Sequence, residues 1–266
     1  MHTGIKSIAL GTGLLASLCF TAHAQAGTFD AGIPAGWTCV GTCGASGANG
    51  VVPLSPAGGS KYGWVATTDS TAAVALPNVG GEGDGTLGST LRSIIFSATA
   101  GTELDFRFNY TTSDGAGYAD YAWARLLDGN NNEVALLFTA RTSENGNAVP
   151  GFAMPAPIAT LTPATVTIDA GKTNWSPLGD DADSCYDVGC GTTGWVKSQY
   201  TIANAGNYKL EFGVTNWNDT DYQSGLAFDA ITLGGVPLPV PEPATYAMLL
   251  AGMTILGSVV KRRKRD

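Results

Sequence analysis

The stretch Thr102-Glu103-Leu104-Asp105-Phe106-Arg107-Phe108-Asn109-Tyr110-Thr111 decides the fold class of this chain. Apolar side chains stand at every second position from Leu104 to Tyr110, and polar side chains stand between them. This period of two is typical of a β-strand with one buried face. The stretch therefore predicts a sheet that covers a hydrophobic core on one side.

Shorter segments on both sides of this strand share its apolar, β-branched and aromatic character. We predict strands at 62–67, 72–76, 91–98, 118–127, 133–139, 164–169, 195–202, 208–216 and 226–233. The Asp-Gly-Asn-Asn-Asn connection at 128–132 is a strong hairpin signal, whereas 25–56, 80–88, 141–163 and 171–194 read as loops. Such spacing, with Gly and Asn turns and no long helical period, predicts an all-β antiparallel β-sandwich, jelly-roll-like, at 25–235.

The N-terminus carries the features of a secretory signal peptide. Lys6 makes the start weakly basic, an apolar run follows at 8–20, and Ala22-His23-Ala24 is a small-residue cleavage site. We predict a signal peptide at 1–24, with cleavage after Ala26 as the alternative. The domain that follows is therefore expected outside the cytoplasm.

The C-terminus has three consecutive parts. A linker at 236–243 ends in Pro241-Glu242-Pro243, residues 244–260 carry no charge, and the end is basic: Lys261, Arg262, Arg263, Lys264 and Arg265. A helix of 17 residues is about 25 Å long, close to a bilayer core of about 30 Å. We predict a transmembrane helix at 244–260, with the basic tail at 261–266 in the cytoplasm and the domain outside.

Pro241-Glu242-Pro243, the apolar helix and the basic end resemble the PEP-CTERM sorting signal, which covers about a tenth of the chain. The resemblance implies recognition and cutting by a membrane protease called an exosortase, after Sec export and signal peptidase cleavage. It also implies a chain tethered at the inner membrane and then sent to the cell surface or the extracellular polysaccharide of a biofilm matrix. A plain tail anchor is the alternative and would change the permanence of attachment but not the topology.

Charge and histidine content exclude several function classes. Without the six basic and two acidic residues of the two ends, eight basic and 20 acidic residues remain, a net charge of about −12. Such a domain repels nucleic acid, which we exclude as a partner. His2 and His23 both lie in the signal peptide, so triad, Cys-His and histidine-metal chemistry are excluded from the mature domain.

Four cysteines remain after the signal peptide: Cys39, Cys43, Cys185 and Cys190. An even number in an exported chain predicts disulfides. The short spacings favour two local loops, but three pairings are open, and long-range bridges would tie the two ends of the domain together.

Other residues suggest ligand sites. Asp180, Asp181, Asp183 and Asp187 form an acidic loop that could bind calcium, although it does not match an EF-hand. Trp175, Trp217 and Tyr222 stand in predicted loops, where aromatic faces suit sugar rings. The segment 224–233 resembles the last strand of jelly-roll ectodomains and carbohydrate-binding modules, and that resemblance implies a structural calcium at Asp229.

We predict no catalytic residue, because no catalytic motif appears in the sequence. The predicted function is that of an exported structural or adhesive protein sorted by an exosortase. A glycan-binding module stabilised by calcium is the first alternative. A glycoside hydrolase that uses two carboxylates is the second.

Overall fold

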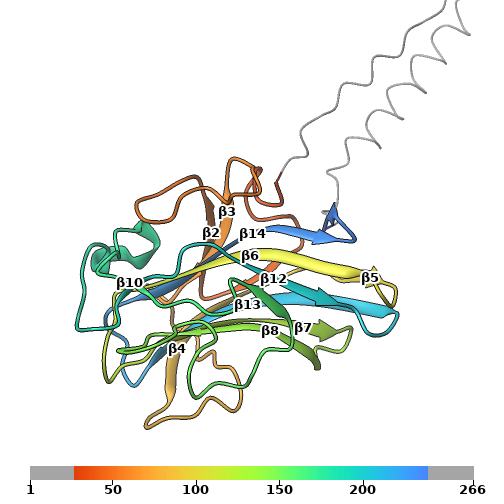
Figure 1. The fold of residues 1–266 in the computed structure, drawn as a ribbon. Helices are drawn as coiled ribbons and strands as arrows, with labels where there is room; N and C mark the ends of the chain where they lie inside the picture. The colour runs from red at the N-terminus through yellow and green to blue at the C-terminus, as the bar shows by residue number, and fades with distance from the viewer. Residues whose placement is uncertain (1–26, 239–266) are drawn as a thin grey trace, which may run out of the picture.

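Two antiparallel β-sheets make up the part of the chain that the computed structural model describes, residues 27–238 (Figure 1). The helical content of this part is one short 3-10 segment, η1 (Ser176–Asp181). The predicted all-β class with antiparallel sheets is therefore confirmed. The signal peptide and the transmembrane helix that we predict lie outside the described residues, and within 27–238 no helix is long and apolar enough to cross a bilayer.

The first sheet has six strands. In spatial order these are β1 (Thr38–Val40), β4 (Gly85–Arg92), β13 (Gly206–Trp217), β7 (Tyr121–Asp128) and β8 (Glu133–Arg141), and β5 (Phe96–Ala98) also pairs with β13. The predicted hairpin is present, since β7 and β8 pair antiparallel across residues 128–132. Asp128 holds this turn by accepting from the backbone N–H groups of Asn130 and Asn132 at 2.8 and 2.9 Å.

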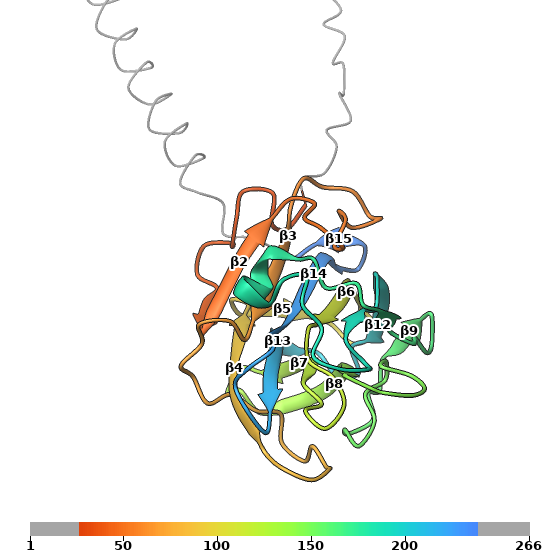
Figure 2. The ribbon, with the colours of Figure 1, turned by 90° about the vertical axis from the view of Figure 1, so that its left-hand side faces the viewer.

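The second sheet has nine strands. Its main order is β10 (Asp169–Ala170), β11 (Gly191–Thr192), β6 (Glu103–Thr112), β14 (Ser224–Leu233), β3 (Tyr62–Ala66) and β2 (Thr42–Ser46). On its flanks, β12 (Val196–Thr201) pairs with β6 and β9 (Thr160–Thr162), and β15 (Val236–Pro237) pairs with β14. The turned view of Figure 2 shows β2, β3 and β14 on the opposite side of the domain from β7 and β8.

The chain crosses from one sheet to the other several times. When β3, β4, β6, β7, β8, β12, β13 and β14 are numbered one to eight in chain order, one sheet reads 2-7-4-5 and the other 1-8-3-6. Consecutive strands therefore often lie in different sheets, and most of the core contacts join residues far apart in the sequence.

The core lies between the sheets. The apolar positions of β6, Leu104, Phe106, Phe108 and Tyr110, are all at most 1% exposed, as the alternation predicted. Phe108 stacks on Phe138 of β8, with ring centroids 3.7 Å apart, and so joins the two sheets. The alternation predicted one buried face, but Asn109 on the other face is also fully buried, because it accepts from Thr192 Oγ1 of β11 at 2.7 Å.

Three strand predictions were wrong. Residues 72–76 alternate in burial but form no ladder, because they extend across the outer face of the first sheet, where Leu76 packs with Trp123. Residues 164–168 form no strand and contribute only an isolated bridge at Val166, whereas Asp169 belongs to β10. The segment 91–98 is divided between β4 and β5, and β4 begins in the predicted loop 80–88.

The segment 25–56 also differs from its prediction as a loop, since it contains β1 and β2. The glycine residues obscure the alternation of these strands in the sequence, but they allow neighbouring side chains to pack closely against the backbone. A Cβ atom at Gly44 would lie 2.3 Å from the Trp64 ring across the β2–β3 ladder. The position therefore has to stay without a side chain.

A charged ladder crosses the outer face of the first sheet. Glu211 on β13 stands in register with Arg92 on β4 and Arg125 on β7. Its carboxylate is 1% exposed, and it accepts from Arg92 Nε at 2.7 Å and from Arg125 Nε at 2.6 Å. One buried carboxylate thus bridges two guanidinium groups on neighbouring strands, and Arg125 also forms an ion pair with Glu133 at 3.5 Å.

Candidate binding site at the loop end of the sandwich

The two tryptophans predicted to bind sugar lie in the core. Trp175 is fully buried and donates from Nε1 to the Tyr62 hydroxyl at 3.0 Å. Trp217 is 4% exposed at the end of β13, where its indole donates to the Glu82 carbonyl at 2.9 Å and Arg141 lies 4.4 Å from its ring centre. The prediction that both stand in open loops was wrong, because loops at this end of the molecule fold back over the sheets.

Tyr222, the third predicted aromatic, has a different position. It is half-buried in the loop between β13 and β14, and its ring centre is 4.9 Å from that of Tyr186. Tyr186 is 46% exposed and meets Tyr118 edge to face at 5.5 Å. We call these three residues the tyrosine cluster. Sequence reading missed Tyr118 and Tyr186, because they belong to two other loops.

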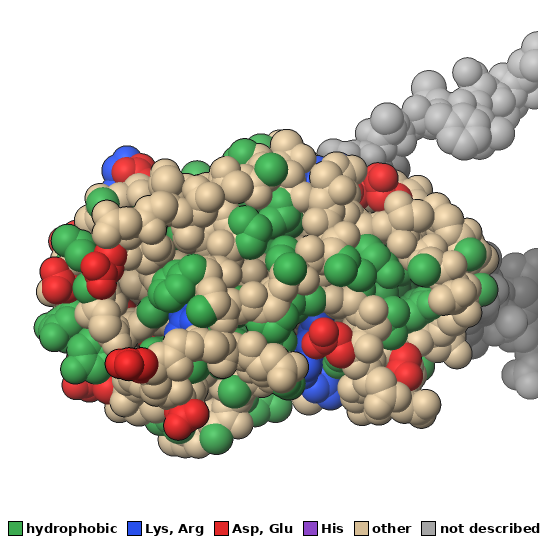
Figure 3. All heavy atoms as spheres, turned by 60° about the horizontal axis from the view of Figure 1, so that its bottom comes forward, with side chains coloured by type: hydrophobic (Ala, Val, Ile, Leu, Met, Phe, Trp, Pro, Cys, Tyr) green, Lys and Arg blue, Asp and Glu red, His purple; other side chains and the backbone are tan. Residues whose placement is uncertain are grey.

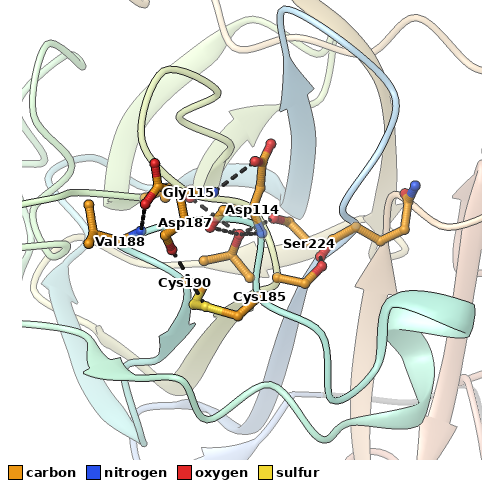
Figure 4. The surroundings of a disulfide bond; sticks show 11 residues. Asp114, Gly115, Cys185, Asp187, Val188, Cys190 and Ser224 are labelled. Atoms are coloured by element: carbon orange, nitrogen blue, oxygen red, sulfur yellow. Dashed lines mark hydrogen bonds between the residues drawn. A yellow bond between two sulfur atoms is a disulfide. The ribbon is translucent and has the colours of Figure 1, made fainter.

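A local disulfide positions the middle tyrosine. The structure pairs Cys185 with Cys190 and Cys39 with Cys43, so both bridges are local. The Cys185–Cys190 bridge holds the loop that contains Tyr186 next to the β6–β7 loop, as Figure 4 shows. Two backbone hydrogen bonds join the loops: Tyr186 N–H donates to the Ser113 carbonyl, and Ala116 N–H donates to the Val188 carbonyl, both at 2.9 Å.

Glycine permits this close contact of loops. A Cβ atom at Gly115 would stand 2.8 Å from the backbone of Asp187, a separation that real Cβ atoms do not adopt. The disulfide loop and the β6–β7 loop therefore form one packed unit.

A hollow of about 530 Å³ adjoins the disulfide on its other side, lined by Ser143, Glu144, Asp187, Val188 and the two cysteines among others. It shares Ser143 and Glu144 with a second hollow of about 510 Å³, next to Phe152, which is 47% exposed. The lining combines carboxylates, hydroxyls and apolar surface, which is the kind of surface that sugars contact. In Figure 3, acidic side chains gather at the left of the molecule, the side where these loops lie in Figure 1.

Two buried carboxyl groups lie beneath the tyrosine cluster, at the two ends of the β6–β7 loop. Asp120 is fully buried; it accepts from Trp217 N–H at 2.8 Å and from the Ser224 hydroxyl at 2.6 Å. Asp114 is 1% exposed; its Oδ1 accepts from Gly115 N–H at 2.7 Å, and its Oδ2 has no partner.

The carboxyl groups of Asp114 and Asp120 influence each other's pKa. Burial, together with the charge of Asp219, raises the pKa of Asp114 to about 8. Burial and the neighbouring Asp114 also raise the pKa of Asp120 well above its usual range. A carboxyl pair shielded in this way has no open face toward a glycosidic oxygen, which a hydrolase would need.

The residues of the predicted acidic calcium loop do not converge. Asp180 and Asp183 are exposed, and Asp181 accepts from Gln223 N–H at 3.1 Å. Within 27–238 no three carboxylate, imidazole or thiol side chains are grouped closely enough to hold a metal ion. Asp181 instead attaches the acidic loop to the β13–β14 loop.

Asp229 fits a cation better. It is 1% exposed on β14, and its Oδ1 has no hydrogen-bond partner. Burial raises its pKa to about 6, and the charge of Asp30 contributes. The residue borders a hollow of about 170 Å³ whose other lining residues lie at 27–28, 57–59, 230–232, 235 and 237. A buried carboxylate oxygen without a hydrogen-bond partner is the type of ligand that calcium takes.

Comparisons with known proteins identify the C-terminal segment. A family model described as the PEP-CTERM protein-sorting motif matches residues 239–265, which confirms the sorting signal predicted from Pro241, Glu242 and Pro243. These three residues and the basic end, like the rest of the segment, lie outside the described residues. No curated protein matches the chain.

Among solved structures, the chain is similar to the enzymatically active domain of bacteriophage CBA120 tailspike protein 4. The TM-score is 0.31 and the identity is 13%, over 75% of this chain and 19% of that chain. The chain thus spans about a fifth of the tailspike chain. A likeness of this degree carries no argument about fold or activity.

Proposed function

We propose that residues 27–238 form the extracellular part of an exosortase substrate and serve a structural or adhesive role at the cell surface or in the surrounding polysaccharide. The single observation that carries the export route is the PEP-CTERM protein-sorting motif at 239–265. A motif of this kind implies export and processing by an exosortase, with attachment to the membrane before the cut. The strand orders 2-7-4-5 and 1-8-3-6 support a jelly roll as the finer description of the domain.

The sorting proposal is tested at Glu242, between the two prolines of the motif. Glu242→Ala should leave an uncut chain in the membrane fraction, whereas the unaltered chain is processed. Glu103→Ala is the matched control, because Glu103 is an exposed glutamate of β6. Normal processing of Glu242→Ala would show that the cut does not depend on the motif, and an unaltered chain that stays uncut in the membrane would leave a plain membrane anchor as the explanation of the C-terminal segment.

A glycan-binding role is the second candidate, and the tyrosine cluster beside the two hollows favours it. Tyr186 is the ring that a sugar could reach, because it is 46% exposed and rests on the disulfide loop. Tyr186→Ala should abolish binding on a glycan array, while Val236→Ala on the distant β15 should not. Equal binding by the two variants would exclude the cluster as the site.

Calcium at Asp229 is part of this second candidate. The Asp229 carboxylate and backbone carbonyls near 27–28 and 57–59 would hold the ion, which would fix the N-terminal segment against the last long strand. A thermal melt of the Asp229→Asn variant, with and without chelator, tests it. The chelator should lower the melting temperature of the unaltered chain and leave the variant unchanged.

The carboxylate hydrolase remains the third candidate. The test is activity on a panel of polysaccharides, with loss of that activity in Glu144→Gln and Asp187→Asn. These two carboxylates line the same open hollow, which makes them the pair to test.

A further inference from the structure

Asparagine followed by glycine occurs twice in residues 27–238, at Asn49-Gly50 and at Asn145-Gly146. This pair is chemically reactive, because glycine has no side chain to shield its backbone nitrogen and leaves the backbone free to turn. The nitrogen can attack the side-chain carbonyl carbon of the preceding asparagine, and the amide is then converted into a carboxylate. The surroundings of each pair decide whether it reacts in the folded protein.

The Asn145-Gly146 pair is open. Both residues are exposed in the loop after β8, and within 27–238 neither the Asn145 side chain nor the Gly146 N–H forms a hydrogen bond. Gly146 has a φ of 87°, and a Cβ atom built there would meet nothing within 4 Å. No contact of the described chain therefore holds the Asn145 amide away from the Gly146 nitrogen.

Ser143 prepares the attacking nitrogen. Its hydroxyl donates to the Asn145 carbonyl at 2.7 Å, and that carbonyl belongs to the same peptide group as the Gly146 nitrogen. Because the peptide group is conjugated, a hydrogen bond to its oxygen draws electron density from its nitrogen. The Gly146 N–H is therefore easier to deprotonate, and the attack requires this deprotonation.

The Asn49-Gly50 pair is closed by comparison. Asn49 Oδ1 accepts from Ser176 N–H at 2.8 Å, and the Asn49 backbone N–H and carbonyl both pair with Val52 at 3.0 Å. A Cβ atom at Gly50 would lie 1.6 Å from the Asn174 carbonyl oxygen, so the backbone there is tightly packed. A reaction at Asn49 first has to break the hydrogen bond to Ser176.

We propose that Asn145 is a site of spontaneous deamidation in the folded protein. The Gly146 nitrogen bonds to Asn145 Cγ, the C–N bond of the side-chain amide breaks, and a succinimide ring is formed. The proton of the Gly146 N–H passes through water to the leaving nitrogen, which departs as ammonia. Water then adds to one carbonyl of the ring and opens it to aspartate or isoaspartate, so the reaction consumes one water, releases one ammonia and needs no enzyme or oxidant.

The new carboxylate stands where the two hollows of the loop end meet. Asn145 lines both hollows, together with Ser143 and Glu144, and Asp187 lines the one beside the disulfide. A further negative charge at this place repels anionic ligands. For the glycan-binding role, on which this consequence rests, the modification lowers the affinity for acidic sugars as the protein ages.

The experiment incubates the full chain at mildly alkaline pH and follows the two Asn-Gly peptides separately by mass spectrometry. In the folded chain, Asn145 should deamidate at least about tenfold faster than Asn49, a difference of about 1.4 kcal/mol in the barrier. In urea the two rates should become similar, because the contacts of Asn49 are lost. Ser143→Ala should slow the reaction at Asn145 and leave the rate at Asn49 unchanged.

Equal rates at the two asparagines in the folded chain, or no modification of Asn145, would overturn the proposal. An unchanged rate at Asn145 in Ser143→Ala would overturn the role given to Ser143.

The effect on ligands is measured separately on a glycan array. Asn145→Asp introduces the charge directly and should weaken binding to acidic glycans. Asn204→Asp is the matched control, because Asn204 is exposed and lines neither hollow. Equal binding by these two variants would overturn the effect on ligands, whereas an unaltered chain that binds no glycan would overturn the glycan-binding role and leave the deamidation of Asn145 as measured.

Discussion

The Cys185–Cys190 disulfide gives the sharpest test of how the loop end is held together. Replacing both residues with serine removes a bridge that closes a loop of about six residues, from a sequence separation of 5. In the chain-entropy description, a loop of that length contributes about 2 kcal/mol to the free energy of unfolding. The domain has 212 described residues, so the expected loss is about 4–8 °C in melting temperature.

The alternative cysteine pairings predict a different loss in the free energy of unfolding. A bridge between either early cysteine and either late one would close a loop of about 150 residues and contribute about 5 kcal/mol. The double serine variant would then lose two such bridges instead of one short one. The two cases therefore differ by more than twofold in the stability change.

The assay is equilibrium unfolding in urea, followed by tryptophan fluorescence, because Trp175, Trp123 and Trp217 are buried in the folded domain. The serine variant of Cys39 and Cys43 is the matched control, since that bridge closes a loop of about five residues. The two variants should lose similar stability, and only Cys185→Ser/Cys190→Ser should weaken glycan binding at the loop end. A loss of 5 kcal/mol or more in either variant would refute local pairing.

Three further predictions concern the sheets and the core. Glu211→Ala should lower the free energy of unfolding by about 3 kcal/mol, because it leaves the Arg92 guanidinium without a carboxylate partner and leaves Arg125 with only the longer ion pair to Glu133. Urea unfolding measures this change, and a loss below about 1 kcal/mol would mean that solvent already screens the charges. Trp175→Ala should cost about 3–5 kcal/mol as a core cavity, and its glycan-array profile should match that of the unaltered chain at temperatures where both are folded. Hydrogen bonds from Asn132 and Asn130 lower the pKa of Asp128. The stability that its charge contributes is therefore present above about pH 4 and is lost as the pH falls through the lowered pKa. The difference in melting temperature between Asp128→Asn and the unaltered chain should disappear near pH 3, and a difference that does not change with pH would mean that packing causes it.

Each kind of information decided a different part of this protein. The alternation of apolar and polar residues from Leu104 to Tyr110 was enough to predict the fold class, because it indicates a sheet with a core on one side. Linear order was likewise enough to predict the sorting signal, because the motif at 239–265 consists of features that follow one another along the chain: Pro241, Glu242, Pro243, the apolar run and the basic end. Composition was enough to exclude histidine chemistry from residues 27–238.

Contacts between distant segments needed the tertiary structure. The alternation of residues 72–76 is typical of a strand. A ladder forms only where a second strand lies alongside to pair with it, and the local sequence does not show whether one does. Trp175 and Trp217 look like loop aromatics, but the loops fold over the sheets and bury them. Tyr118, Tyr186 and Tyr222 come from three loops. Asp120 accepts from Trp217 N–H and the Ser224 hydroxyl only because strand pairing brings the ends of β7, β13 and β14 together. Sequence patterns show periods of a few residues, whereas these sites depend on packing between residues that are more than a hundred positions apart in the sequence.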